Sequence, residues 1–151
     1  MGTLARRVVA LAALAFWLGG LTFYALVAVP VGTAVLGGAV AQGFLTQAVT
    51  ARLNLVALGA LAVLAWNAFA TRRGMVVATW AVMLAAQGFL FALHPTLDHM
   101  LDPHTHTVVD HARFYAMHRV YLLVTAVQWV AGLLHLVLLV AAWRAKDSVP
   151  R

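Results

Sequence analysis

The sequence predicts an all-α protein: a four-helix bundle that lies in a membrane. Both termini should be cytoplasmic, and a loop rich in His and Asp should face outward. The chain of 151 residues is 64% hydrophobic and only 9% charged, whereas soluble domains carry about 25% charged residues. Four stretches contain no Asp, Glu, Lys or Arg, namely residues 8–51, 53–71, 74–97 and 120–143. Each is long enough for a membrane core, which needs about 20 apolar residues of helix.

Charge and residue usage narrow the classes of function. The net charge is +6, but the basic residues form small clusters at the ends of the apolar stretches, which is typical of membrane orientation. The chain has no cysteine, which excludes disulfides, thiolate metal sites and cysteine nucleophiles. Membrane lipid is therefore an expected partner and nucleic acid is not, while a homo-oligomer or a larger membrane complex stays open. The length fits one domain, residues 1–151.

The first half of the chain should hold two spans joined by a glycine-rich connector. We place the first span at Val8–Val29, because Pro30 disfavours helix in the residue before it and should kink or end the helix. Residues 31–50 are small and mildly polar. They predict a turn near residues 37–38, followed by an amphipathic segment. The second span is Leu53–Ala70.

The second half of the chain should hold the other two spans. The turn Thr71–Gly74 is short, so the second and third spans form an antiparallel hairpin. We place the third span at Met75–Leu93, closed by Pro95, and the fourth at Tyr115–Trp143. Helix should begin ahead of the fourth span, because Thr107–Asp110 has the form of a capping box.

Small residues recur at steps of three and four along the third span. Such ridges let helix backbones approach closely in lipid, so we expect this face to pack inside the bundle. The ridge consists of Ala78, Ala81, Ala85, Gly88 and Ala92.

The basic residues predict the orientation. With four spans the termini share a side with the 72–73 turn, and that side carries seven Lys and Arg against three on the other. The seven are Arg6, Arg7, Arg72, Arg73, Arg144, Lys146 and Arg151; the three are Arg52, Arg113 and Arg119. Since positive charge favours the cytoplasmic side, the termini should be cytoplasmic and the protein should lie in the inner membrane.

Residues 94–118 are the most unusual segment. They hold six of the seven histidines and three of the four acids, and imidazole and carboxylate suit zinc, copper or iron. Helix ends hold ligands more rigidly than loops do, so the candidate metal ligands are His94, Asp98, His111 and His118 rather than His104 and His106. The structural alternative is an ordinary polar loop, in which Asp102 and Asp110 have local turn and capping roles.

His94 and His118 also form a candidate pair on their own. One ends the third span and the other lies near the start of the fourth, so both should lie at similar depth. Two such histidines are able to ligate a haem iron. The cofactor is therefore unknown from sequence, with a divalent metal and a haem as candidates and an interfacial hydrogen-bonded pair as the structural alternative.

Among the polar residues within the spans, four are singled out: Asn67, Gln87, Gln128 and His135. Polar side chains in spans usually face the bundle interior and hydrogen-bond across helices. We expect an interhelical polar network here, and a proton or ion path is the functional alternative.

Several segments together resemble a known family, the small four-helix bacterial membrane domain of unknown function related to the transmembrane-protein-205-like proteins. The likeness rests on residues 16–24 with Pro30, on residues 52–54, and on residues 114–121 with Gln128 and Trp129. It implies a compact four-helix membrane domain and no established reaction. A weaker likeness is to copper-resistance membrane domains, which also use histidines on the outer side.

The leading functional hypothesis is a non-enzymatic multi-pass inner-membrane protein that serves as an accessory or complex-forming subunit. The alternative is metal (copper or zinc) handling or a transport-associated role that uses the outward loop. A third is a haem-bearing electron-transfer protein.

Overall fold

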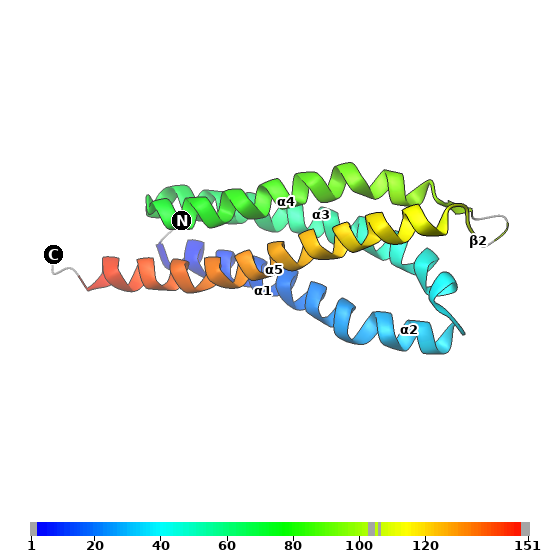
Figure 1. The fold of residues 1–151 in the computed structure, drawn as a ribbon. Helices are drawn as coiled ribbons and strands as arrows, with labels where there is room; N and C mark the ends of the chain where they lie inside the picture. The colour runs from blue at the N-terminus through cyan, green and yellow to red at the C-terminus, as the bar shows by residue number, and fades with distance from the viewer. Residues whose placement is uncertain (1–2, 103–104, 106, 149–151) are drawn as a thin grey trace.

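A computed structural model, which describes residues 3–102, 105 and 107–148, shows a bundle of long helices (Figure 1). The first is built from α1 (Thr3–Phe23), the π-helix η1 (Tyr24–Ala28) and α2 (Val29–Val35). The others are α3 (Ala39–Thr71), α4 (Gly74–Asp98) and α5 (His111–Asp147). A two-stranded antiparallel hairpin, β1 (Leu101–Asp102) and β2 (Thr107–Val108), lies between α4 and α5. The predicted all-α class is confirmed.

Four helical stretches are long and apolar enough to cross a membrane: Thr3–Val35, Ala39–Thr71, Gly74–Asp98 and His111–Asp147. They contain the four predicted spans and extend each of them. The start of α1, the α3–α4 turn and the end of α5 lie together at one end of the bundle, whereas α2 and the β hairpin lie at the other (Figure 1).

Helix continues through Pro30, so of the two expected outcomes there, a kink or an end of the helix, the end is wrong. The five residues before Val29 form the π-helix, and the Val29 N–H donates to the Tyr24 carbonyl. A proline ring clashes with the carbonyl four residues earlier in an α-helix. The wider π turn makes room for that ring, and the chain then resumes α-helix in α2.

Two other predicted helix ends also need correction. Pro95 lies inside α4, which runs on to Asp98. The expected capping box at Thr107 is wrong, because Thr107 belongs to β2. Asp110 caps α5 instead, since its carboxylate accepts a hydrogen bond from the Arg113 N–H at 3.0 Å. That acceptor satisfies one of the free N–H groups of the first helical turn.

The predicted turn near residues 37–38 is present between α2 and α3. Gly37 has φ of 76°, a left-handed conformation that glycine adopts without steric cost. At the other end of α3, Arg72 takes the left-handed C-cap position with φ of 55°.

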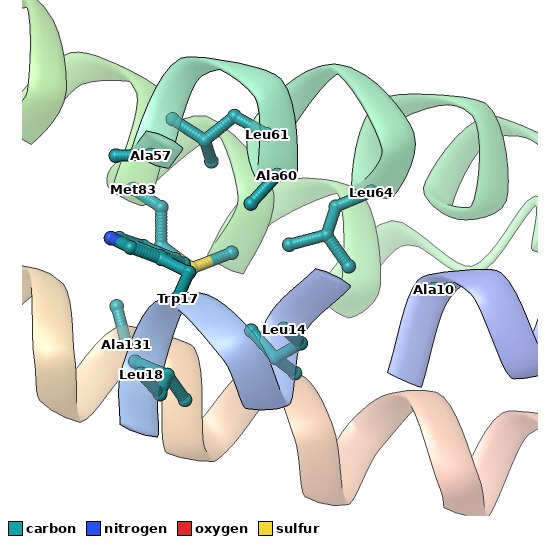
Figure 2. Close-up of a cluster of buried hydrophobic side chains, with 10 residues drawn as sticks. All are labelled: Ala10, Leu14, Trp17, Leu18, Ala57, Ala60, Leu61, Leu64, Met83 and Ala131. Atoms are coloured by element: carbon teal, nitrogen blue, oxygen red, sulfur yellow. The ribbon is translucent and has the colours of Figure 1, made fainter. Parts of the chain in front are cut away.

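The main hydrophobic core joins α1, α3, α4 and α5 (Figure 2). In the close-up, Trp17 of α1 lies against Met83 of α4 and close to Ala57 of α3. The Trp80 indole nitrogen donates to the Leu61 carbonyl at 2.9 Å, which ties α4 to α3. The cluster consists of Ala10, Leu14, Trp17, Leu18, Ala57, Ala60, Leu61, Leu64, Met83 and Ala131.

The small-residue ridge of α4 does not pack inside the bundle. Ala78, Ala81, Ala85, Gly88 and Ala92 are all exposed on the surface of the bundle. The buried face of α4 is the opposite one, with larger side chains such as Met83 and Leu90. Small residues on a helix permit close packing of backbones, but here the bundle interior is filled by long side chains, so the ridge is left facing outward.

α1 and α5 cross closely and then separate. A Cβ atom on Gly132 would lie 2.9 Å from a Leu18 methyl group. One turn further on, the Trp129 indole nitrogen donates to the Thr22 hydroxyl at 2.9 Å. Beyond this crossing, η1 and α2 turn away from α5 (Figure 1). We call the part between this crossing and the helix ends at Arg7 and Asp147 the closed half, and the part on the side of α2 and the β hairpin the open half.

Candidate functional site

The open half contains a cleft made of two adjoining hollows of about 260 and 210 Å³. The deeper hollow is lined by the end of α1, by η1 and by α3, α4 and α5. The outer hollow extends it toward the β hairpin. Five residues line both hollows, namely Val29, Thr46, Thr50, His118 and Tyr121. The far end of α2 returns to α3, where the Gln42 side chain occupies the space beside Gly32.

A chain of hydrogen bonds among four buried side chains runs along one wall of the cleft. The Gln128 amide nitrogen donates to the Gln87 side-chain oxygen at 2.9 Å, and the Gln87 amide nitrogen donates to Asn54 Oδ1 at 3.0 Å. Asn54 and the Tyr121 hydroxyl lie 3.2 Å apart. We call Tyr121, Asn54, Gln87 and Gln128 the polar ladder. It joins α3, α4 and α5 in the buried, mostly apolar interior of the bundle.

The ladder provides hydrogen-bond partners for buried side-chain amides, and its residues also line the cleft. Gln128 also donates to the Met83 carbonyl at 3.1 Å. A buried amide without a partner costs several kcal/mol, roughly, in hydrocarbon, so the ladder fixes the relative rotation of the three helices. Its four side chains also line the deeper hollow, whose remaining walls include Trp17, Leu21 and Leu90.

Two residues that line the cleft each carry a polar side-chain atom without a hydrogen-bond partner in the described part of the chain. The Tyr24 hydroxyl is shielded from solvent and makes no hydrogen bond, and Tyr24 lines the deeper hollow. Gln42 Oε1 is likewise shielded and unpartnered, and Gln42 lines the outer hollow. Buried polar groups are nearly always hydrogen-bonded. Both atoms therefore retain an unused hydrogen-bonding capacity on residues that line the cleft.

The outer hollow carries the histidines at the ends of α4 and α5. His94 Nδ1 lies 2.8 Å from Asp98 Oδ2. The His94 ring also meets the Tyr121 ring edge-on, at 6.3 Å between centroids. His118 stacks on Phe114 with centroids 5.7 Å apart and an interplanar angle of 7°. All five of these residues line the outer hollow.

Three of the four predicted metal ligands therefore lie on one hollow, and the fourth does not. His94, Asp98 and His118 line it, whereas His111 is exposed and stacks on Tyr115. Within residues 3–102, 105 and 107–148, no group of three or more His, Asp or Glu is placed to hold a metal ion. His104 and His106, which the sequence placed on the loop, lie outside the described residues.

The four polar residues predicted within the spans are all buried, but they divide among three places. Gln87 and Gln128 belong to the ladder. His135 Nδ1 lies 2.9 Å from the Thr79 hydroxyl, and Asn67 donates to the Arg6 carbonyl at 3.4 Å. In the described part of the chain, no hydrogen bond joins the ladder to the Thr79–His135 pair. The proton or ion path considered from the sequence stays a prediction.

Sequence reasoning missed Asn54, Tyr121 and Tyr24 as site residues. A signal was present for Tyr121, because Tyr121, Gln128 and His135 follow one another at intervals of seven and share a helix face. Asn54 had no such signal, since it follows Arg52 at the predicted start of a span. Tyr24 became important only because the π-helix sets its position.

The chain matches no protein-family model, no curated protein and no solved structure. The likeness to the small four-helix membrane domain thus stays a prediction from residues 16–24, 52–54 and 114–121. The function has to be argued from the cleft itself.

Proposed function

We propose that this chain is a non-enzymatic accessory protein of the inner membrane that binds a membrane-dissolved amphipathic molecule in the cleft of its open half. The observation that carries the proposal is a cleft with largely apolar walls whose lining residues include Tyr24 and Gln42, each with a shielded and unpartnered polar atom, Tyr24 Oη and Gln42 Oε1. Ligand sites are mostly apolar hollows with a few converging polar groups.

The walls indicate what kind of molecule fits. Trp17, Leu21 and Leu90 offer an apolar surface for a hydrocarbon or ring body. The Tyr24 hydroxyl is able to donate a hydrogen bond, and Gln42 Oε1 is able to accept one. The ligand we expect therefore has an apolar body and a head group that carries both an acceptor and a donor.

The orientation belongs to the same proposal. The end of the bundle that holds the helix ends of α1 and α5 carries six of the nine basic residues in the described part of the chain. The positive-inside rule puts that end in the cytoplasm, so the cleft opens in the outer half of the membrane. Reporter fusions at the C-terminus and at residue 104 test this. An extracytoplasmic C-terminus would refute the orientation.

The binding proposal is tested by filling the cleft. Wild-type protein is purified from its native membranes in mild detergent, extracted with organic solvent, and its bound hydrophobic molecules are identified by mass spectrometry. Thr50 lines both hollows, so Thr50→Trp should remove the enriched molecule. Tyr24→Phe deletes only the hydroxyl and should weaken retention.

Leu26→Trp is the matched control. It adds an indole to the same membrane region, at a side chain that is 72% exposed and lines neither hollow. The control should retain the molecule as the wild type does. An extract that is the same for wild type, Thr50→Trp and Leu26→Trp would overturn the proposal, provided that all three unfold at similar temperatures.

The accessory role includes binding to another protein. The outward ridge of Ala78, Ala81, Ala85, Gly88 and Ala92 leaves α4 with a face at which a further helix is able to approach closely. Cross-linking in native membranes from a photoreactive residue at Ala85 tests this part. A lipid-only product at that position would remove it.

Metal handling is the second candidate function, and one observation favours it. Histidines that bind metals usually donate their other ring N–H to a carboxylate, and His94 Nδ1 has that contact with Asp98. Its Nε2 is then the ligand atom, and His118 lines the same hollow. A metal here would take its remaining ligands from water or from a bound molecule.

Isothermal titration with zinc and with copper tests this candidate. His118→Ala should weaken binding, whereas His111→Ala, on an exposed ring stacked on Tyr115, should not. Equal binding by both variants and the wild type, or none by any of them, would remove the metal site. A Soret band in the same preparation would instead indicate the haem alternative.

A further inference from the structure

Another hollow, separate from the cleft, lies at the opposite end of the bundle, where the helix ends of α1, α3, α4 and α5 meet. Its volume is about 720 Å³. Five basic side chains line it, contributed by three separate parts of the chain: Arg6, Arg7, Arg72, Arg73 and Lys146. We call it the basic pocket. It shares no lining residue with the cleft.

One of these cations, Arg7, is already paired with an acidic residue, and the pair joins two helices at the pocket wall. Arg7 donates two hydrogen bonds to the Asp147 carboxylate, at 2.6 and 2.9 Å. The Arg7 guanidinium also lies 5.3 Å from the centre of the Trp143 ring. These contacts join the start of α1 to the end of α5. Arg7 is therefore a structural part of the pocket wall.

The other basic side chains leave an excess of positive charge. In the described part of the chain, Arg6, Arg72 and Arg73 form no ion pair. The Arg6 Nε atom is shielded from solvent and has no hydrogen-bond partner. Arginine presents a planar fork of donors that matches phosphate oxygens in pairs. The pocket thus has the charge and the donors for a phosphate group.

The depth of the pocket suggests where such a phosphate would come from. The uncharged stretches of the sequence begin at residue 8, end at residue 71, begin again at residue 74 and end at residue 143. The lining residues directly flank these limits, so the pocket lies at the border of the apolar spans. In a bilayer that border is the layer of lipid phosphates.

We infer that the basic pocket binds the phosphate group of an anionic phospholipid. Apolar residues that line it, among them Ala70, Ala142 and Trp143, would contact the start of the acyl chains. A general basic surface would attract anionic lipid at any Lys or Arg. If the pocket is a specific site, loss of its own arginines should weaken lipid binding more than loss of other basic residues does.

The experiment uses purified full-length protein in detergent, with bound lipids counted by native mass spectrometry. The probes are dioleoyl phosphatidylglycerol and dioleoyl phosphatidylcholine, which share acyl chains and differ in charge. The wild type should retain phosphatidylglycerol more tightly. The double variant Arg72→Gln/Arg73→Gln should bind it about 25-fold more weakly, at about fivefold for each basic side chain lost near an anionic surface.

Two controls separate the pocket from general charge. Arg113→Gln/Arg119→Gln removes the same charge from exposed positions at the other end of the bundle. Arg144→Gln removes an exposed charge at the same end, outside the pocket lining. Both should bind phosphatidylglycerol as the wild type does.

Three results would overturn the inference: equal retention of the two lipids by the wild type, equal loss in the double variant and its charge-matched control, or equal loss in Arg144→Gln. Inorganic phosphate, added at millimolar concentration, identifies the source of the phosphate. If it displaces phosphatidylglycerol completely, the pocket recognises a soluble phosphate as well as it does a lipid, and the lipid assignment is wrong.

Discussion

The closed and open halves of the bundle are built from the same four membrane-length helices, yet they differ in what lies between α1 and α5. In the closed half, Leu18 packs against Gly132 and the ion pair of Arg7 with Asp147 joins the helix ends. In the open half, η1 and α2 leave α5, and the cleft lies between them. The departure coincides with the π-helix and Pro30.

This difference separates stability from binding. The ladder lies on α3, α4 and α5, which stay joined to one another in the open half by its hydrogen bonds. Only the first helix leaves. The polar groups that line the cleft are therefore held on packed helices, a condition for a precise binding site. The closed half is filled mainly by apolar side chains and also holds the Thr79–His135 pair and the hydrogen bond from Asn67 to the Arg6 backbone.

The largest effect should come from forcing the closed half apart. Gly132→Leu places a large side chain where a Cβ alone would already lie 2.9 Å from Leu18. Overpacking of this kind costs about 1–3 kcal/mol. We expect Gly132→Leu to lower the thermal unfolding temperature in detergent and to weaken the Trp129–Thr22 hydrogen bond beside it.

Gly88→Leu is the control for that prediction. Gly88 lies on the outward ridge of α4, and a Cβ there would meet nothing within 4 Å. Its stability should stay close to that of the wild type. Should both leucine variants lose stability alike, the α1–α5 crossing would not be the point that holds the closed half together.

The second effect should come from breaking the ladder in the open half. Gln87→Leu removes the hydrogen bonds to Asn54 and Gln128. Interhelical hydrogen bonds in membranes average about 0.6 kcal/mol, so two of them and the amides left unpaired should amount to about 1–2 kcal/mol. The measurement is reversible unfolding in mixed micelles.

Gln47→Leu makes the same chemical change at a half-buried glutamine of α3 whose side chain makes no hydrogen bond in the described part of the chain. It should be nearly neutral. If Gln47→Leu destabilised the protein as much as Gln87→Leu, the cost would come from losing any glutamine amide and not from the ladder.

Much of the fold could be predicted because long apolar stretches without charge indicate membrane spans directly. The stretches without charge located four helices, and residues 37–38 located a turn whose Gly37 has a positive φ. The behaviour at Pro30 could not be predicted, since a π-helix upstream accommodates the ring and no local residue pattern announces one. The outward ridge of α4 was misassigned because small residues favour any close helix contact, whether inside the bundle or outside it.

Less of the site could be predicted. The sequence identified Gln87, Gln128 and the histidines at the helix ends as candidate site residues, because they are polar and lie in or beside apolar spans. The sequence does not show which of them touch, because this depends on the rotation of each helix about its axis. Thr79 pairs with His135, whereas Asn67 bonds to the backbone of Arg6.

The smallest effect should be confined to the tip of the open half. Gly37→Ala introduces a Cβ at φ of 76°, which costs about 1 kcal/mol in the left-handed region. We expect faster amide hydrogen exchange at residues 31–42 and unchanged exchange near Arg7 and Asp147, because the strain falls on the α2–α3 turn. Gly43→Ala, inside α3 with no atom within 4 Å of its Cβ, should slow exchange slightly, since alanine favours helix. Faster exchange over both halves in Gly37→Ala would contradict this prediction, because the two halves would then unfold as one unit. The closed and open halves would in that case differ in packing but not in local stability.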